Sequence, residues 1–542
     1  MARTSRRRQA AKLMAKPSDS TMGEDNPDDR ISSLPNDILL NILDRLDVRA
    51  AARTSVFSRR WSQLPTMLPR IIISAPDLLP SETKTKKTND KLVQRTKAAV
   101  ANAGLSKAEL VQRTSAAVAK ALADAAKAAA NTGAAKVTKS ILARRDPGGW
   151  PIRLLSMTFY LRDDAPISVG HAVGSAMATF KVEKAEFTVL TEKERLECTI
   201  HDLMKYGARF VSFFKECPNA FAGLTRLYLG NLRFAESDFV SNILVTCKRL
   251  KYLGFLNCDT ESWITLQVQH AQLSELGIVN CRFDMVKLDW VPKLTWMVFE
   301  FWMSFEEPPL SFGYVPLLEV LSVSNVGLSW HEMVKLSTFV FDTSVRDLRL
   351  GFKCEKIWVQ PECLTKRLSS VFHQLRIVNL VDIPEGYDLT WTMFILEAAP
   401  SLEEFYMTVM DHPCEMQMDQ EKRKAKSYSE HKDVEWESPT SNFKHHRLAK
   451  LIMFCFQSDD YMVSHVRRVM KAAVNLRDVY LYDRLTCPKC RDIKPLKPIR
   501  HPGTIKQRCW VEKQIRGDIE SLATIHFLTN TQIRADHVSR IV

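Results

Sequence analysis

The fold is decided by the stretch Leu224-Thr-Arg-Leu-Tyr-Leu229, which has leucine at its first, fourth and sixth positions. Further copies, with other apolar residues allowed, begin at Leu250, Leu273, Leu294, Leu318, Val345, Leu375, Leu402, Leu448 and Leu476. The successive spacings are 26, 23, 21, 24, 27, 30, 27, 46 and 28 residues. Weaker copies begin at Leu154 and Val182. A pattern repeated at this period indicates stacked units, because one unit cannot bury its apolar side alone.

The local form of each unit follows from the alternation in its last three pattern positions. Alternating apolar and variable residues predict a short strand, and the segment between two copies can return as a helix or an irregular arm. An ordinary α/β domain does not explain about ten copies of one pattern. The 46-residue spacing contains a highly charged stretch, so we expect a charged loop over 411–441.

This pattern resembles the leucine-rich repeat, including the cysteine that the family places after the strand, here Cys258 and Cys281. The resemblance implies an α/β solenoid of horseshoe form over residues 150–410. The region 442–542 resembles the FBD region that follows the repeats in many plant F-box proteins, with a strand, a helix and another strand extending the sheet. Cys455-Phe456 stands where that region usually has Gly-Phe.

The first apolar rhythm near the N-terminus begins at Ile31, and the sequence that carries it continues to Arg59-Arg60-Trp61. Ser33 and Pro35 suit the start of a helix, since a hydroxyl caps it and proline fixes φ. The apolar residues that follow recur at helical spacing on one face. Three helices over residues 30–75 are too few to cover that much apolar surface, so a partner or a neighbouring domain must bury it.

Residues 34–61 resemble the F-box of plant F-box proteins. That family docks its helices on the Skp adaptor of the SCF (Skp, cullin, F-box) ubiquitin ligase. The resemblance implies adaptor-contact or scaffold roles for Leu34, Pro35, Ile38, Leu39, Ile42, Leu43 and Trp61. The alternative is a three-helix element that merely packs against the repeats.

The net charge of +14 is concentrated in two segments of the chain. Residues 1–16 carry six bases and no acid (+6), and residues 81–150 carry fourteen bases and five acids (+9), which leaves about −1 for the remainder. This distribution argues against specific recognition of nucleic acid. We expect a disordered tail over 1–29 and a helical or disordered, mobile Ala/Lys-rich insertion over 76–149, in which 92–100 is echoed by 110–118.

The variable strand positions are the candidate contacts with a target protein, because they can change without disturbing the core. They mix charged with aromatic groups, as protein-binding surfaces do. The residues we single out are Arg226, Tyr228, Lys251, Tyr252, Glu275, Trp296 and Arg346. The tryptophans Trp263, Trp296, Trp302, Trp330, Trp358 and Trp391 are further candidate anchors, although most are expected in the core.

No catalytic motif is found, so we expect no enzyme activity and no cofactor. Cys487-Pro-Lys-Cys490, with His501 and Cys509, offers a zinc-binding alternative, but the irregular onward spacing favours reduced surface cysteines. No long apolar span or secretory leader appears, which predicts an intracellular protein that does not enter the membrane, in the cytoplasm, the nucleus or both.

The resemblances together predict a substrate-recognition subunit of an SCF-type ubiquitin ligase. Its F-box would bind the Skp adaptor and, through it, the cullin, and its repeats would bind a protein substrate. The alternative is a leucine-rich-repeat interaction scaffold without a role in a ligase.

Overall fold

The computed structural model describes residues 31, 34–46, 50–51, 54, 59–80, 108–302, 309–325, 333–339, 344–352, 357–363, 366–410, 443–485, 498 and 500–540. The chain divides into two compact units, Met1–Leu68 and Pro69–Val542. The expected tail over 1–29 and the expected charged loop over 411–441 lie outside the described residues.

The first unit is helical. It contains α1 (Asn36–Leu43) and α3 (Arg59–Met67), and Ala50 and Ala51 between them are also helical. One apolar cluster holds these pieces together, and its members are Leu39, Leu43, Ala51, Trp61, Leu64 and Leu68. Leu39 and Leu43 are four residues apart, so α1 presents both on one face.

The second unit is built on one parallel sheet. Its strand order follows the chain and runs through β1 (Arg70–Ser74), β2 (Ile152–Tyr160), β3 (Val182–Leu190), β4 (Arg226–Gly230), β6 (Tyr252–Leu256), β9 (Glu275–Val279), β11 (Trp296–Trp302), β13 (Val320–Asn325), β15 (Asp347–Gly351), β17 (Ile377–Ile383), β18 (Glu404–Val409), β19 (Lys450–Phe454), β20 (Asp478–Tyr482) and β21 (Thr524–Leu528). Every copy of the pattern found in the sequence, the two weaker ones included, supplies one strand. The fold is thus the α/β solenoid expected from the resemblance to leucine-rich repeats.

The first and last strands, β1 and β21, were not expected. Both also follow the pattern, as Leu68-Pro-Arg-Ile-Ile-Ile73 and Leu522-Ala-Thr-Ile-His-Phe527. The range 30–75 expected for the F-box therefore includes a strand that pairs with β2 of the repeat array. The first copy was missed because isoleucines replace its second and third leucines, and the last copy because polar residues surround its apolar positions.

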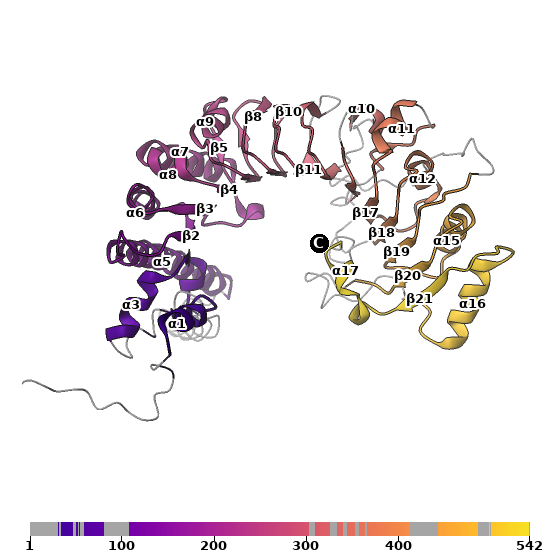
Figure 1. The fold of residues 1–542 in the computed structure, drawn as a ribbon, viewed down its shortest axis with the longest axis horizontal. Coiled ribbons are helices and arrows are strands. Elements are labelled where there is room, and N and C mark those ends of the chain that lie inside the picture. The colour runs from indigo at the N-terminus through magenta and orange to yellow at the C-terminus, as the bar shows by residue number, and fades with distance from the viewer. Residues whose placement is uncertain are drawn as a thin grey trace, which may run out of the picture. The chain divides into compact units, whose positions relative to one another are not determined.

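The return segments lie on one side of the sheet. Figure 1 shows helices there, namely α5 (Ala108–Ala143), α6 (Ala165–Thr179), α7 (Ile200–Glu216), α8 (Pro218–Gly223), α9 (Phe239–Thr246), α11 (Lys366–Phe372), α12 (Met393–Ala398), α15 (Asp460–Ala472) and α16 (Ile505–Arg516). A second parallel sheet of β8 (Thr265–Gln269), β10 (Met285–Trp290) and β12 (Leu310–Tyr314) replaces the helices in the middle of the array. We call the opposite side of the main sheet its inner face.

The core lies between the sheet and the return segments. The second and third pattern positions point into it, so that Leu227 and Leu229 are fully buried. Phe159, Phe187 and Phe213 form an aromatic group whose ring centroids lie 5.4 to 5.9 Å apart. Aromatic side chains of this size dominate the apolar area that such a core removes from water.

Cysteine and histidine side chains satisfy backbone groups in the core. The Cys258 thiol lies 3.6 Å from the carbonyl oxygen of Leu229, and the Cys258 N–H donates to the Cys281 sulfur at 3.4 Å.

His270 and His445 each stand three residues before the first leucine of a copy. In His445, Nδ1 accepts the Leu448 N–H at 2.9 Å and Nε2 lies 2.9 Å from the Ala399 carbonyl oxygen. Neutral imidazole therefore closes the turn that leads into the strand.

The Ala/Lys-rich segment forms the helix α5, which packs against the first strands of the repeat array. Ala130, Ala134 and Thr138 are buried, and α5 packs against β1, β2 and α6. The Asn131 amide donates to the Tyr160 carbonyl at 2.8 Å and accepts the Tyr160 N–H at 2.9 Å. Alanine allows this close approach, and α5 thereby acts as the return segment of the first repeat. The earlier copy of its echo, 92–100, lies outside the described residues.

Candidate protein-interaction surfaces

The apolar residues of α1 divide into a buried and an exposed set. Leu39, Leu43 and Trp61 belong to the core of the first unit, and Leu34 packs against its edge. Ile38 and Ile42, in contrast, are 44% and 41% exposed, and Pro35 is exposed beside them. Of the seven residues that the resemblance assigned to contact or scaffold roles, three are scaffold and three lie on the surface.

The exposed set extends beyond the residues expected from the sequence. Leu46 is 42% exposed and stands four residues after Ile42, which itself stands four after Ile38. We call Pro35, Ile38, Ile42 and Leu46 the α1 stripe. An i, i+4 spacing places Ile38 and Ile42 on one line along α1, and Leu46 lies three residues beyond the end of the helix, where its N–H donates to the Leu43 carbonyl at 3.0 Å.

Arg60 fixes the start of α1. Its guanidinium donates to the Leu34 carbonyl at 2.6 Å and to the Asn36 side-chain oxygen at 2.8 and 2.9 Å. These bonds connect the first turn of α3 to the residues on either side of Pro35. The α1 stripe is therefore held by a polar clamp as well as by the buried cluster.

The inner face of the repeat array places four of the expected target contacts in one row. The strand register sets Arg226 opposite Tyr252, Tyr252 opposite Glu275 and Glu275 opposite Trp296. Neighbouring strands lie about 4.8 Å apart, so these side chains follow one another directly. Glu275 is exposed and the other three are half-buried. We call these four residues the inner row.

Two glycines shape the surface beside the inner row. Gly254 and Gly277 occupy the next inward position on β6 and β9, in register with Tyr228 of β4. The Tyr252 hydroxyl and the edges of the Tyr228 and Tyr252 rings lie within 3 Å of where a Cβ on Gly254 would stand. The two tyrosines thus lie flat over bare backbone. Neither glycine was singled out from the sequence.

The positive charge of Arg226 lies against the face of an aromatic ring. The Arg226 guanidinium lies over the Tyr252 ring at 3.4 Å from its centroid. Burial raises the pKa of Tyr228 to about 12, and burial also raises the pKa of Tyr252. Both phenols are neutral at pH 7 and available as hydrogen-bond donors beside a cation, an arrangement suited to protein recognition.

A ladder of asparagines borders this surface. Asn231, Asn257 and Asn280 follow β4, β6 and β9, and all three have positive φ. The Asn257 amide donates to the Asn231 side-chain oxygen at 2.8 Å, and the Asn280 amide donates to that of Asn257 at 3.1 Å. Asparagine tolerates this backbone conformation better than most residues, and the ladder links the ends of the three neighbouring strands.

The remaining sequence-predicted contacts lie elsewhere. Lys251 and Arg346 are exposed but precede their strands, so they border the inner face without joining the row. Among the tryptophans, Trp302, Trp358 and Trp391 are buried in the core, Trp296 is half-buried and Trp263 is exposed. Trp330 lies outside the described residues.

The zinc alternative gains no support from the part of the chain that the structure covers. Cys487 and Cys490 lie outside it, Cys509 is exposed on α16, and the His501 Nε2 atom lies 3.2 Å from the Leu481 carbonyl oxygen. Within the described ranges, no three His, Cys, Asp or Glu side chains come close enough to hold a metal ion. Among the same residues, no helix has the length and apolar character needed to cross a membrane.

Comparison with known proteins places both units in families. A family model for the leucine-rich-repeat domain of At1g61320/AtMIF1 matches residues 202–514, and a model for the F-box domain matches residues 31–72. The first match covers more than half of the chain. The protein therefore combines an F-box with a leucine-rich-repeat solenoid, and it belongs to the plant F-box/leucine-rich-repeat proteins of the At1g61320/AtMIF1 type.

One curated relative also matches the chain. It is the F-box/FBD/LRR-repeat protein At2g04230 of Arabidopsis thaliana, which is 52% identical over 44 residues. These residues make up 8% of this chain and 10% of the relative, so the match spans about a tenth of the relative's length.

Proposed function

We propose that this protein is the substrate-selecting subunit of an SCF-type ubiquitin ligase. F-box domains as a class bind the Skp adaptor within SCF complexes. The observation that carries the proposal is the α1 stripe, a line of half-exposed apolar side chains backed by a closed core. Ile38 and Ile42 are 44% and 41% exposed, so covering the rest of each side chain contributes about 1 kcal/mol, and the whole stripe contributes a few times that. Through the Skp adaptor the chain reaches the cullin.

The target, in this proposal, is a protein held by the inner row and Tyr228. Arginine, tyrosine and tryptophan are the residues that most often dominate protein interfaces, and here they follow one another on a rigid sheet. Lys251 and Arg346 would add contacts from the border of the same face. The subunit selects its target inside the cell, in the cytoplasm, the nucleus or both, and leaves the chemistry of ubiquitin transfer to its partners.

The competing candidate is a leucine-rich-repeat scaffold without a ligase role. The tagged full-length chain, expressed in plant cells and purified under gentle conditions, distinguishes the two. Our proposal predicts Skp and cullin in the purified complex. Other proteins without Skp or cullin would favour the scaffold, and a complex of nucleic acid that dissociates in salt would contradict both.

A comparison of variants tests the assignment of the inner face. Arg226→Ala combined with Trp296→Ala should lose a set of proteins that the wild-type chain captures, while Skp is retained at the same yield. The matched control is Val245→Ser, which changes an exposed residue of α9 on the opposite side of the sheet. Identical captured sets for all three chains would contradict the assignment.

A further inference from the structure

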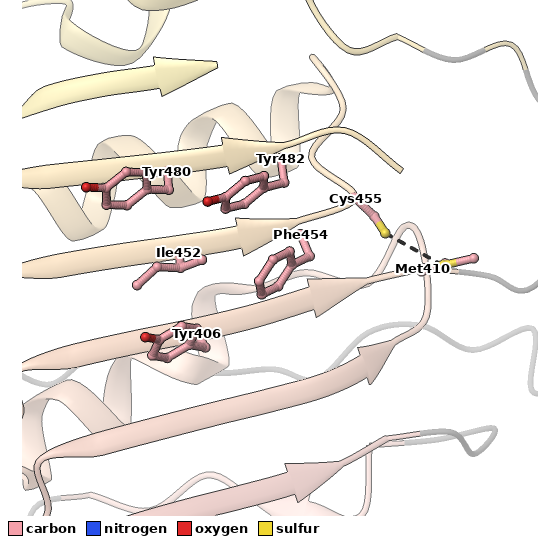
Figure 2. Close-up of a cluster of buried hydrophobic side chains, with 7 residues drawn as sticks. All are labelled: Tyr406, Met410, Ile452, Phe454, Cys455, Tyr480 and Tyr482. Atoms are coloured by element: carbon pink, nitrogen blue, oxygen red, sulfur yellow. Dashed lines mark hydrogen bonds between the residues drawn. The ribbon is translucent and has the colours of Figure 1, made fainter. Parts of the chain in front are cut away.

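The inner face changes character in the C-terminal part of the array. Figure 2 shows Tyr406, Ile452, Phe454, Tyr480 and Tyr482 on one face of β18, β19 and β20. All five side chains are almost completely buried, although the inner row on β4 to β11 is half-buried or exposed. Something must cover them, because the helices α15 and α16 lie on the other side of the sheet (Figure 1).

The cover is the chain's own C-terminal segment, residues 529–540. It contains the short helix α17 (Ala535–Val538), which Figure 1 shows on the inner face. Ile533 packs against the buried cluster. His537 is fully buried, with its ring centroid 4.8 Å from that of Tyr480, 5.8 Å from that of Tyr406 and 5.9 Å from that of Tyr482. We call these three tyrosines the tyrosine cradle.

Polar contacts fix the orientation of the segment in the cradle. The Tyr482 hydroxyl lies 2.9 Å from His537 Nδ1. Burial lowers the pKa of His537, so the ring is neutral at pH 7 and Nδ1 shares one hydrogen bond with the Tyr482 hydroxyl. Three residues further on, the Arg540 guanidinium pairs with the carboxylate of Asp347 on β15. The Arg540 carbonyl accepts a hydrogen bond from the Asn379 amide of β17 at 2.7 Å.

The segment is held in the manner of a short peptide ligand. Between Arg534 and Ser539 only His537 is buried, and Arg540 is the second, half-buried anchor. The segment adds no strand to the main sheet, so side chains and single hydrogen bonds hold it rather than a backbone ladder.

We propose that the tyrosine cradle, with Asp347, is a peptide-binding site for a segment that carries a histidine followed three residues later by an arginine. In this chain the C-terminal segment occupies the site in cis. The site is separate from the inner row of the proposed function and does not depend on it. A partner protein with the same His-x-x-Arg chemistry gains access only when the C-terminal segment leaves.

The experiment uses the chain ending at Ile533 and a labelled synthetic peptide of residues 534–542. We expect saturable binding of the peptide to the shortened chain, measured by fluorescence anisotropy, and no binding to the full-length chain, whose site is filled. Asp347→Asn in the shortened chain should weaken binding about tenfold, since it removes the partner of a partly buried cation. The peptide with His537→Ala should not bind.

Matched controls separate recognition from nonspecific attachment. The peptide with Val538→Ala changes an exposed residue next to the anchor and should bind as the original does. If the shortened chain does not fold, the full-length chain with His537→Ala and Arg540→Ala replaces it and should bind the wild-type peptide. Failure of both chains to bind, equal binding by the full-length wild-type chain, or no loss with the His537→Ala peptide would overturn the proposal.

Discussion

Gly254 tests whether the tyrosines of the inner face depend on bare backbone beneath them. In Gly254→Ala, the new Cβ would stand 2.6 Å from the Tyr252 hydroxyl and 2.9 Å from the Tyr228 ring. Ordinary contacts are about 3.5–4.0 Å, so both rings must move by about 1 Å. The displaced Tyr252 ring then leaves the Arg226 guanidinium, which now lies 3.4 Å from its centroid. Gly254→Ala should therefore disrupt the packing of Arg226, Tyr228 and Tyr252 on the inner face and leave the core unchanged.

The magnitude follows from two opposed contributions. Replacing glycine with alanine in a strand restricts the unfolded chain and stabilises by about 0.4–1 kcal/mol where the conformation permits it. Loss of the cation–π contact costs about 0.5–2 kcal/mol, and displacement of the rings adds to that cost. Gly277→Ala is the matched control, because its Cβ would meet no atom closer than 3.8 Å. We expect Gly254→Ala to be less stable than Gly277→Ala by about 1–2 kcal/mol.

The assay is urea unfolding of both variants followed by circular dichroism, with amide hydrogen exchange of β6 as a local probe. Gly254→Ala should exchange faster in β6, while Gly277→Ala should equal or exceed the wild type in stability. Equal stability and equal exchange in the two variants would refute the view that the absent side chain of Gly254 leaves room for the two tyrosines.

Two further predictions concern the packing and the pH dependence of the array. Gly207→Ala should destabilise the protein by about 3 kcal/mol or more, because its Cβ would stand 1.8 Å from the Arg233 carbonyl oxygen. The control is Gly133→Ala, whose Cβ would lie 3.5 Å from its nearest neighbour and which should stabilise helix α5 slightly. Thermal unfolding measures both effects. Burial lowers the pKa of His270 and His445 from 6.5, so unfolding takes up protons as the pH falls below about 6.5. The free energy of unfolding should be constant above about pH 6.5 and should decrease as the pH falls below it. His445→Gln should make this decrease smaller, and a stability that rises on acidification would contradict the capping role.

The sequence predicted the repeats well because each one must bury the same side of a strand. The repeat spacing can therefore be recognised in the amino-acid sequence, even where Val182 or Val345 replaces the first leucine of a copy. Strands β1 and β21 carry the same signal in weaker form. The Ala/Lys-rich segment was harder, since alanine indicates a helix but reveals little about what the helix packs against.

The sites were less predictable than the fold. Helical spacing grouped the apolar residues of α1 but did not separate the buried Leu39 from the exposed Ile38, because that division depends on where α3 lies. The contact of residues 529–540 with Asp347 joins positions almost two hundred residues apart and leaves no periodic trace. Such contacts follow from the curvature of the assembled sheet rather than from any local pattern.

An affinity measurement on three variants tests whether the α1 stripe binds the Skp adaptor. Ile38→Asp and Ile42→Asp each place a charge in the stripe, and Asn41→Asp adds the same charge at an exposed polar position of the same helix. Isothermal titration of the full-length chains with purified Skp adaptor should show a loss of at least about a hundredfold for the first two, or about 3 kcal/mol. Asn41→Asp should stay within a few-fold of the wild type. Wild-type affinity in Ile38→Asp and Ile42→Asp, or no binding by the wild-type chain, would contradict the account.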